Sequence, residues 1–243
     1  MSRKPVALVT GSSSGIGAAV ARRLSDEGMA VVVNAARSAD AGRRLAESLP
    51  DARFVQADIS DEEQVRRLLN EVAGEYGALD VLVNNAGVTR GIPHQDLEAA
   101  TGEVWRTILG VNVVGTWQTT VAAMPLLRAS GAGHVVNISS VAGVRPAGSS
   151  IPYAVSKAAV NHMTRLLAAA VGPEVRVNAI APGLVDTPWT ETFTEIRERV
   201  REAVPLRRTG TPEDIAELVV GLYRAAYTTG EVVLADGGAH LLI

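Results

Sequence analysis

The stretch Val6-Ala7-Leu8-Val9-Thr10-Gly11-Ser12-Ser13-Ser14-Gly15-Ile16-Gly17 decides the fold, and a helical run to Leu24 follows it. A short apolar strand passes through a glycine-rich turn directly into a helix. In this order, the free N–H groups of the helix N-terminus lie where a pyrophosphate can bind. Three glycines alone could make an ordinary tight turn, but the strand and the helix on either side favour nucleotide binding.

The second predicted strand, Ala30 to Val33, ends without a carboxylate. In a dinucleotide-binding fold, an acidic residue at this position binds the 2′-hydroxyl of the NAD ribose. The sequence has Asn34-Ala35-Ala36-Arg37-Ser38 instead, which places a guanidinium and a hydroxyl within reach of that ribose. This favours the 2′-phosphate of NADP as the group that Arg37 and Ser38 bind. The alternative is that Arg37 is a solvated residue at the start of a helix.

The rest of the chain alternates strands with helices, and no linker, repeat or change of composition divides residues 1–243. Sequence patterns predict further strands at 53–57, 79–83, 134–138, 175–180 and 231–234, and helices at 38–49, 61–76, 101–129, 152–171 and from 211 onward. This alternation is typical of a single α/β domain with a doubly wound, Rossmann-type parallel sheet. Leu184–Val204 interrupts it as a polar insertion, which we expect to be a lid.

Composition restricts the function classes. Apolar residues make up 47% of the chain and aromatic residues 4%, which suits a parallel sheet buried on both faces. The net charge is −3 without a basic block, so we expect neither nucleic acid nor an anionic membrane as a partner. Cysteine is absent and the four histidines lack metal-ligand spacing, so we expect no metal. No signal-peptide or membrane-length apolar run is present, which indicates a cytoplasmic protein.

A phenol and an ammonium stand one helical turn apart in Tyr153-Ala154-Val155-Ser156-Lys157. Residues at i and i+4 project from the same face of a helix, and a cation beside a phenol favours the phenolate. Such a tyrosine can exchange a proton with an alcohol or a ketone near neutral pH. Taken alone, the five residues are better explained as an interfacial tyrosine and a solvated lysine. The nucleotide-binding stretch, and Ser140 thirteen residues before Tyr153, favour catalysis instead.

The chain resembles the classical short-chain dehydrogenase/reductase family over essentially its whole length. The matching residues are Thr10 to Gly17, Asp58, Asn84-Asn85-Ala86-Gly87, Asn112, Ser140, Tyr153 with Lys157, and Pro182-Gly183 followed by Thr187. The resemblance implies a seven-stranded parallel sheet in the order 3-2-1-4-5-6-7, with the nicotinamide at the carboxyl ends of the strands. It also implies hydride transfer between a nicotinamide cofactor, NADP in preference to NAD, and a ketone or secondary alcohol.

The resemblance further implies a role for each matching side chain. Tyr153 exchanges a proton with the substrate oxygen, which Ser140 holds, and Lys157 lowers the pKa of Tyr153 and binds the nicotinamide ribose. Asn112 would fix a water that relays protons to Lys157. The implied cofactor contacts are Gly11, Ser13, Ser14, Gly15, Ile16, Gly17, Arg37, Ser38, Asp58, Ile59, Asn85, Ala86, Gly87, Tyr153, Lys157, Pro182, Gly183, Val185 and Thr187.

Within the family, the chain is most similar to 3-oxoacyl-[acyl-carrier-protein] reductases, at Val88-Thr89-Arg90, Pro205-Leu206-Arg207-Arg208 and Pro212-Glu213-Asp214. This implies a small-molecule or acyl-thioester substrate. The chain departs from many NADP-using relatives at Ser14, where they have a basic residue, and its segment Gly221–Gly230 is shorter than usual. The alternatives are an NAD-linked dehydrogenase of a sugar, polyol or steroid-like alcohol and, outside enzymes, a nucleotide-binding regulatory protein.

The loops that follow strands four, five and six should determine substrate choice, because such sheets bind their ligands at the carboxyl ends of the strands. These loops are Val88–Ala99, Val141–Pro152 and Leu184–Val204, and His94 is the histidine placed to touch a substrate. In the predicted lid, Trp189 and Phe193 are the expected apolar contacts.

Two helices, 101–129 and 152–171, are apolar over more of their circumference than one sheet face requires, so we expect a homotetramer. Val113, Trp117, Val121 and Met124 cannot all face the sheet together with Val104, Ile108 and Val111. The apolar C-terminal run Ala239-His240-Leu241-Leu242-Ile243 also needs a surface to dock on. Members of the family commonly pair these helices about one two-fold axis and the C-terminus about another.

Overall fold

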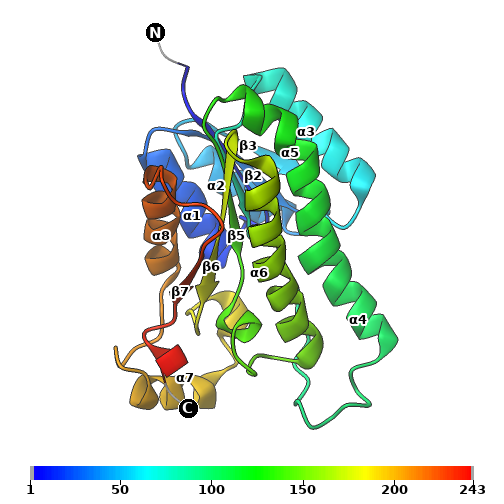
Figure 1. The fold of residues 1–243 in the computed structure, drawn as a ribbon, viewed down its shortest axis with the longest axis vertical. Helices are drawn as coiled ribbons and strands as arrows, with labels where there is room; N and C mark the ends of the chain where they lie inside the picture. The colour runs from blue at the N-terminus through cyan, green and yellow to red at the C-terminus, as the bar shows by residue number, and fades with distance from the viewer. Residues whose placement is uncertain (1–2, 242–243) are drawn as a thin grey trace.

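A parallel sheet of seven strands runs through the middle of the computed structural model, which describes residues 3–241 (Figure 1). The strands are β1 (Val6–Val9), β2 (Ala30–Ala35), β3 (Ala52–Gln56), β4 (Val81–Asn84), β5 (Gly133–Ile138), β6 (Val175–Pro182) and β7 (Val232–Ala235). Their order is β3-β2-β1-β4-β5-β6-β7, and every neighbouring pair is parallel. The predicted fold class and strand order are confirmed.

Helices cover both faces of this sheet (Figure 1). They are α1 (Gly15–Asp26), α2 (Ala39–Glu47), α3 (Glu62–Tyr76), α4 (Gly102–Leu109), α5 (Thr116–Ala129), α6 (Ile151–Val171), α7 (Thr194–Ala203) and α8 (Pro212–Arg224). Strand residues alternate between two buried clusters: Val6 and Leu8 pack with α3, α5 and α6, whereas Ala7 and Val9 pack with α1, α2 and α8. Apolar side chains therefore line both sheet faces, as in other parallel sheets.

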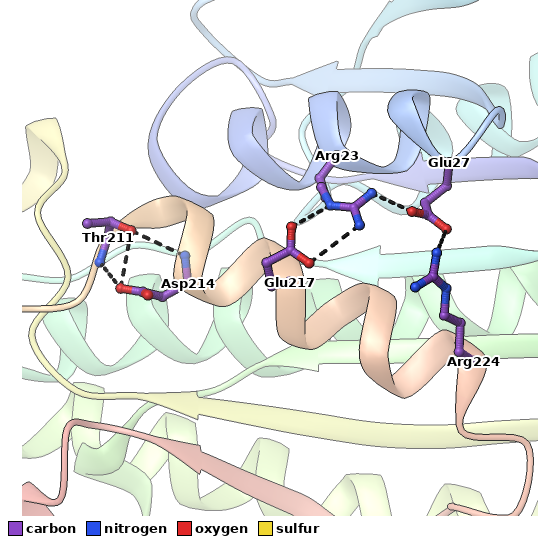
Figure 2. A network of polar contacts seen from close by, with 6 residues as sticks. All are labelled: Arg23, Glu27, Thr211, Asp214, Glu217 and Arg224. Atoms are coloured by element: carbon purple, nitrogen blue, oxygen red, sulfur yellow. Dashed lines mark hydrogen bonds and ion pairs between the residues drawn. The ribbon is translucent and has the colours of Figure 1, made fainter.

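Local sequence signals explain several helix ends. Asp61 caps α3, because its side chain accepts hydrogen bonds from the backbone N–H groups of Glu63 and Gln64. Gly77 ends that helix at a φ of +71°. Thr211 and Asp214 form a reciprocal capping box at the start of α8 (Figure 2).

Charged side chains join the outer surfaces of α1 and α8 (Figure 2). Arg23 of α1 donates to Glu217 of α8 and to Glu27, and Arg224 of α8 donates to the same Glu27. Hydrogen bonds to the two carboxylates raise the pKa of Arg23, and the pKa of Glu27 is lowered, chiefly by Arg23. This network adds ion pairs to the packing of α1 against α8.

The expected long helix 101–129 is not α-helical throughout. A π-helical segment, Gly110–Gly115, separates α4 from α5. The segment contains the buried Asn112, whose side chain bonds the backbone of Val88 through both its oxygen and its nitrogen. A widened turn of this kind is frequent at functional sites. Tertiary contacts to a neighbouring loop therefore override the regular helical pattern here.

The predicted lid, residues 184–204, contains a 3₁₀ turn, Pro188–Thr190, and the helix α7. In Figure 1, α7 lies beyond the carboxyl ends of the strands, close to the described end of the chain. Two further 3₁₀ turns, Val141–Gly143 and Ala239–Leu241, lie at the same end of the sheet.

Candidate active site

A cleft of about 1570 Å³ lies at the carboxyl ends of the strands. The three predicted substrate loops and the glycine-rich turn all contribute to its lining. Of the predicted site residues, only Gly17 and Asn112 are absent from the lining. Both lie just behind it, where they pack against residues that do line the cleft.

The glycine-rich turn permits a close approach of two backbones. Gly11 has a φ of +61°, and a Cβ there would lie 2.7 Å from the Ala86 Cα. At Gly17, a Cβ would lie 2.5 Å from the side-chain nitrogen of Asn85. Asn85 donates that nitrogen to the carbonyls of Thr10 and Gly11, at 2.9 Å each. The strand-four motif thus holds the glycine-rich turn in place.

The start of α1 offers free donors to the cleft. Ser14 is the N-cap of α1 in an extended conformation, and within residues 3–241 its side chain makes no capping hydrogen bond. Ser13, Gly15 and Ile16 line the cleft beside it. The unpaired N–H groups and the positive end of the helix dipole at this position suit a phosphate anion.

The side chain of Asn34, near the end of β2, hydrogen-bonds backbone groups of the protein. Its amide nitrogen donates to the carbonyls of Val55 and Ala57 at 3.1 Å, and its oxygen accepts from the Gly11 N–H at 3.4 Å. The exposed Arg37 and Ser38 follow it and line the cleft. This end of the cleft therefore presents a guanidinium and a hydroxyl, as the sequence predicted.

Tyr153, Lys157 and Ser140 meet on the floor of the cleft. α6 presents Tyr153 and, one turn later, Lys157, whose Nζ lies 5.7 Å from the centre of the Tyr153 ring. The Ser140 side chain hydrogen-bonds the Tyr153 phenol and also caps the 3₁₀ turn that follows β5. The neighbouring Ser139 donates its hydroxyl to the Lys157 carbonyl at 3.2 Å. Ser140 is thus the serine that hydrogen-bonds the Tyr153 phenol.

Burial, and not the neighbouring ammonium, dominates the ionisation of this group. Desolvation raises the pKa of the Tyr153 phenol, and the hydrogen bond from Ser140 offsets part of that effect. Burial lowers the pKa of Lys157 to about 8. Lys157 is not among the causes of the Tyr153 pKa shift, so its expected effect on that pKa stays a prediction. The Lys157 Nζ donates to the Ile138 carbonyl at 2.8 Å. Desolvation disfavours both the Tyr153 phenolate and the Lys157 ammonium.

Asn112 connects to the catalytic helix through a residue that the sequence reasoning missed. The Asn112 amide donates to the Ser156 hydroxyl at 3.0 Å, and that hydroxyl donates to the Tyr153 carbonyl at 2.7 Å. A Cβ at Gly87 would lie 3.3 Å from the Asn112 side-chain oxygen and 3.7 Å from the Lys157 Nζ. Gly87 therefore leaves open the space between these two groups. A serine between Tyr153 and Lys157 was the only signal for Ser156 in the sequence.

The substrate loops contact one another and the catalytic tyrosine. The Ile92 N–H donates to the Ser149 carbonyl at 2.8 Å, and the hydroxyls of Thr89 and Ser149 lie 2.5 Å apart. From the lid, the ring of Trp189 packs edge-on against that of Tyr153, with centroids 6.2 Å apart. All three predicted loops thus surround one site.

Two features of residues 3–241 bear on the expected partners. No helix in this range is both long and apolar enough to span a membrane. The same range contains no group of three histidine, aspartate or glutamate side chains arranged to hold a metal ion.

The chain matches known proteins over nearly its full length. The family model described as enoyl-(acyl carrier protein) reductase matches residues 11–240. "Granaticin polyketide synthase putative ketoacyl reductase 2" of Streptomyces violaceoruber is 66% identical over 241 residues, which cover 98% of this chain and 97% of that protein. The 3-oxoacyl-[acyl-carrier-protein] reductase FabG of Thermotoga maritima is 36% identical over 240 residues, 96% of each chain.

The fold has close counterparts too. A Burkholderia xenovorans crystal structure described as a short-chain dehydrogenase/reductase superposes with a TM-score of 0.93 at 38% identity, covering 99% of this chain and 100% of that chain. The sheet order and the Ser140, Tyr153 and Lys157 cluster agree with that likeness. The protein therefore belongs to the short-chain dehydrogenase/reductase family and is a nicotinamide-dependent oxidoreductase.

Proposed function

We propose that the protein reduces the ketone of a 3-oxoacyl thioester, with NADPH as the preferred cofactor. The observation that carries this proposal is the cluster of Ser140, Tyr153 and Lys157 on the cleft floor. The 66% identity to a protein named as a ketoacyl reductase supports the substrate class. The Tyr153 phenol is protonated at neutral pH and can therefore act as the proton donor of a reduction.

The residues present fit a nicotinamide dinucleotide. The close approach at Gly11 and the free donors at Ser14 suit the pyrophosphate, and Asp58 with Ile59 lines the cleft where an adenine would lie. Arg37 and Ser38 would hold a 2′-phosphate. Carboxamide contacts would come from the chain after β6, and the remaining expected contacts are Ser13, Gly15, Ile16, Asn85, Ala86, Gly87, Pro182, Gly183, Val185 and Thr187.

Each side chain of the site then has its own role in the reaction. When bound, the nicotinamide supplies the hydride. Ser140 holds the carbonyl oxygen beside Tyr153, which donates its phenolic proton to that oxygen as negative charge develops. Lys157 lies beside the Tyr153 ring. Asn112 holds α6 in position through its hydrogen bond to Ser156, which in turn bonds the Tyr153 carbonyl. A water held by Asn112 would return a proton by way of Lys157.

The change of Tyr153 to Phe tests the mechanism, since it keeps the ring and removes the proton. We expect kcat with NADPH and a 3-oxoacyl thioester to fall by about a hundredfold or more. Cofactor binding, measured by fluorescence titration, should persist. Tyr227→Phe is the matched control, because Tyr227 is fully exposed and lies outside the cleft. Parental turnover by the Tyr153 variant would reject the mechanism.

Comparative titration with NADPH and NADH separates the remaining alternatives. We expect tighter binding of NADPH, and a loss of that preference in Arg37→Ala. A clear preference for NADH, together with oxidation as the working direction, would favour a sugar, polyol or steroid-like alcohol dehydrogenase. Tight binding without turnover of any ketone or alcohol would favour a regulatory protein.

The proposed assembly is a homotetramer. Support comes from exposed apolar side chains on neighbouring helices, Trp117 and Val121 of α5 and Val155 and Leu166 of α6. An apolar surface of this kind on a monomer is a common sign of an interface. The expected second contact involves the C-terminus, where Leu242 and Ile243 lie outside the described residues.

A further inference from the structure

The side of α6 that carries the reacting groups continues one turn beyond Lys157. Tyr153, Lys157 and Asn161 follow one another at intervals of four residues, so they lie along the same side of the helix. Asn161 is 5% exposed and is not part of the cleft lining. No step of the proposed reaction uses this buried amide.

The hydrogen-bonding capacity of the Asn161 amide is only partly used. Its nitrogen donates to the Gly143 carbonyl at 3.1 Å. Its oxygen is buried and has no hydrogen-bond partner within residues 3–241. A buried polar atom without a partner costs free energy, which a leucine at the same position would avoid. Stability alone therefore does not explain an amide here, and the bond to Gly143 is the contact that needs a reason.

Gly143 ends the 3₁₀ turn that begins at Ser140. Ser140 is the N-cap of the turn Val141–Gly143, and the Gly143 N–H donates back to the Ser140 carbonyl at 2.9 Å. The Ser140 hydroxyl also accepts a backbone hydrogen bond from within the turn, at 3.1 Å. The same hydroxyl bonds the Tyr153 phenol. The carbonyl that Asn161 binds and the hydroxyl that meets the phenol thus belong to one hydrogen-bonded turn.

This turn lies directly on the backbone of α6. A Cβ at Gly143 would lie 2.6 Å from the carbonyl carbon of Lys157. Ser139 donates its hydroxyl to the Lys157 carbonyl at 3.2 Å, which ties the start of the turn to the helix. Asn161 ties the end of the turn to the same helix, one helical turn further on. Since α6 also carries Tyr153, these two contacts set the position of the turn relative to the phenol.

We infer that Asn161 is a positioning residue for the reduction, because it fixes the turn that holds Ser140 against the Tyr153 phenol. The inference rests on the proposed function and adds a residue that lies outside the cleft lining. Asn161 acts through Ser140 and not on the substrate. Catalysis depends closely on geometry, and a displacement of a reacting group by about 1 Å can slow a reaction about a hundredfold.

The variant Asn161→Leu tests the inference, since it keeps the branched shape of the side chain and removes the amide. We expect the rate of hydride transfer, measured in a single turnover of NADPH with a 3-oxoacyl thioester, to fall about ten- to a hundredfold. The affinity for NADPH, measured by titration, should change less than about twofold, because the groups assigned to the dinucleotide are untouched. Asn161→Ala removes the same donor without adding volume and should lose a similar factor.

A double-mutant cycle with Ser140→Ala identifies the route of the effect. Without the Ser140 hydroxyl, the position of the turn no longer affects the phenol, so Asn161→Leu should slow that background less than about twofold. Leu167→Ala is the matched control. Leu167 is buried on the same helix, six residues beyond Asn161, in the cluster that α6 forms with α3 and α5. Its loss should lower the melting temperature but keep the rate within about twofold of the parent.

The two proposals fail in different ways. Circular dichroism and NADPH titration check that each variant is folded. Parental rates in both Asn161 variants, or an equal loss with and without the Ser140 hydroxyl, would overturn the inference and leave a Tyr153-dependent reaction standing. Absence of turnover in the parent rejects the proposed function, and the inference with it.

Discussion

Lys157 illustrates how burial changes a single ionisable group. Its side chain is 5% exposed, and its pKa is lowered from 10.5 to about 8, because the apolar surroundings disfavour the charged form. The unfolded chain therefore binds more protons than the folded chain between about pH 8 and 10.5. The cost of burying the ammonium is present in full below pH 8, and the free energy of unfolding rises as pH passes from 8 to 10.5.

This pKa can be measured directly, because Lys4 and Lys157 are the only lysines in the sequence. In protein labelled with carbon-13 lysine, we expect the Lys157 signal to titrate with a midpoint near pH 8 in the absence of nucleotide. Lys4→Arg leaves this one signal and so assigns it. A midpoint near 10.5 would show that Lys157 is not desolvated in solution.

At the scale of elements, α7 depends on few contacts. Its residues are all at least partly exposed, and the ion pair between Arg197 and Asp186 is partly open to solvent. A pair of this kind contributes about 0.2–1 kcal/mol. The lid is therefore only weakly held over the cleft, which suits an element that has to admit and release a substrate.

Arg197→Gln should loosen the lid without changing the reacting groups. We expect KM to rise roughly two- to fivefold with little change in kcat, and amide exchange in α7 to quicken by a similar factor. Reversing the pair, with Asp186→Arg and Arg197→Asp together, should restore much of the loss. Arg199→Gln is the control on the exposed face. Unchanged exchange in the Arg197 variant would exclude the ion pair as a restraint.

At the scale of the whole molecule, the apolar surface predicted on α5 and α6 is present in part. Trp117 is 49% exposed and Leu166 is 59% exposed, but Met124 is buried against the sheet. Of the residues expected not all to face the sheet, α5 turns Met124 toward the core and leaves Trp117 and Val121 exposed. The remaining patch extends over α5 and α6, and α6 packs against α4 and the π-helical segment that precedes α5.

Trp117→Asp should weaken association through this patch. In sedimentation velocity at micromolar concentration, we expect the parent to sediment as a tetramer and the variant as a smaller species, since burying an unpaired carboxylate is costly. Leu97→Asp is the control: Leu97 is 68% exposed, more than Trp117, but lies on the loop after β4. A parental species of 25.4 kDa would exclude the assembly altogether.

Local interactions made much of the protein predictable from its sequence. The glycine-rich turn, the capped starts of α3 and α8 and the spacing of Tyr153 and Lys157 each depend on residues a few positions apart. Strand and helix alternation follows from apolar periodicity, which any parallel sheet with two covered faces requires. The strand order came from the family resemblance, since periodicity alone does not set which strands are neighbours.

Only the tertiary structure decided the features that depend on distant segments. The π-helical turn contains Asn112, which bonds Val88, and Ser156 gains its contact with Asn112 because α6 packs beside that turn. The direction of the Tyr153 pKa follows from how deeply the folded chain buries the phenol, which neighbours in sequence do not set. The sequence by itself determined which groups are available for chemistry. The packing of segments far apart in the chain decided their solvation, their partners and the surface that each one faces.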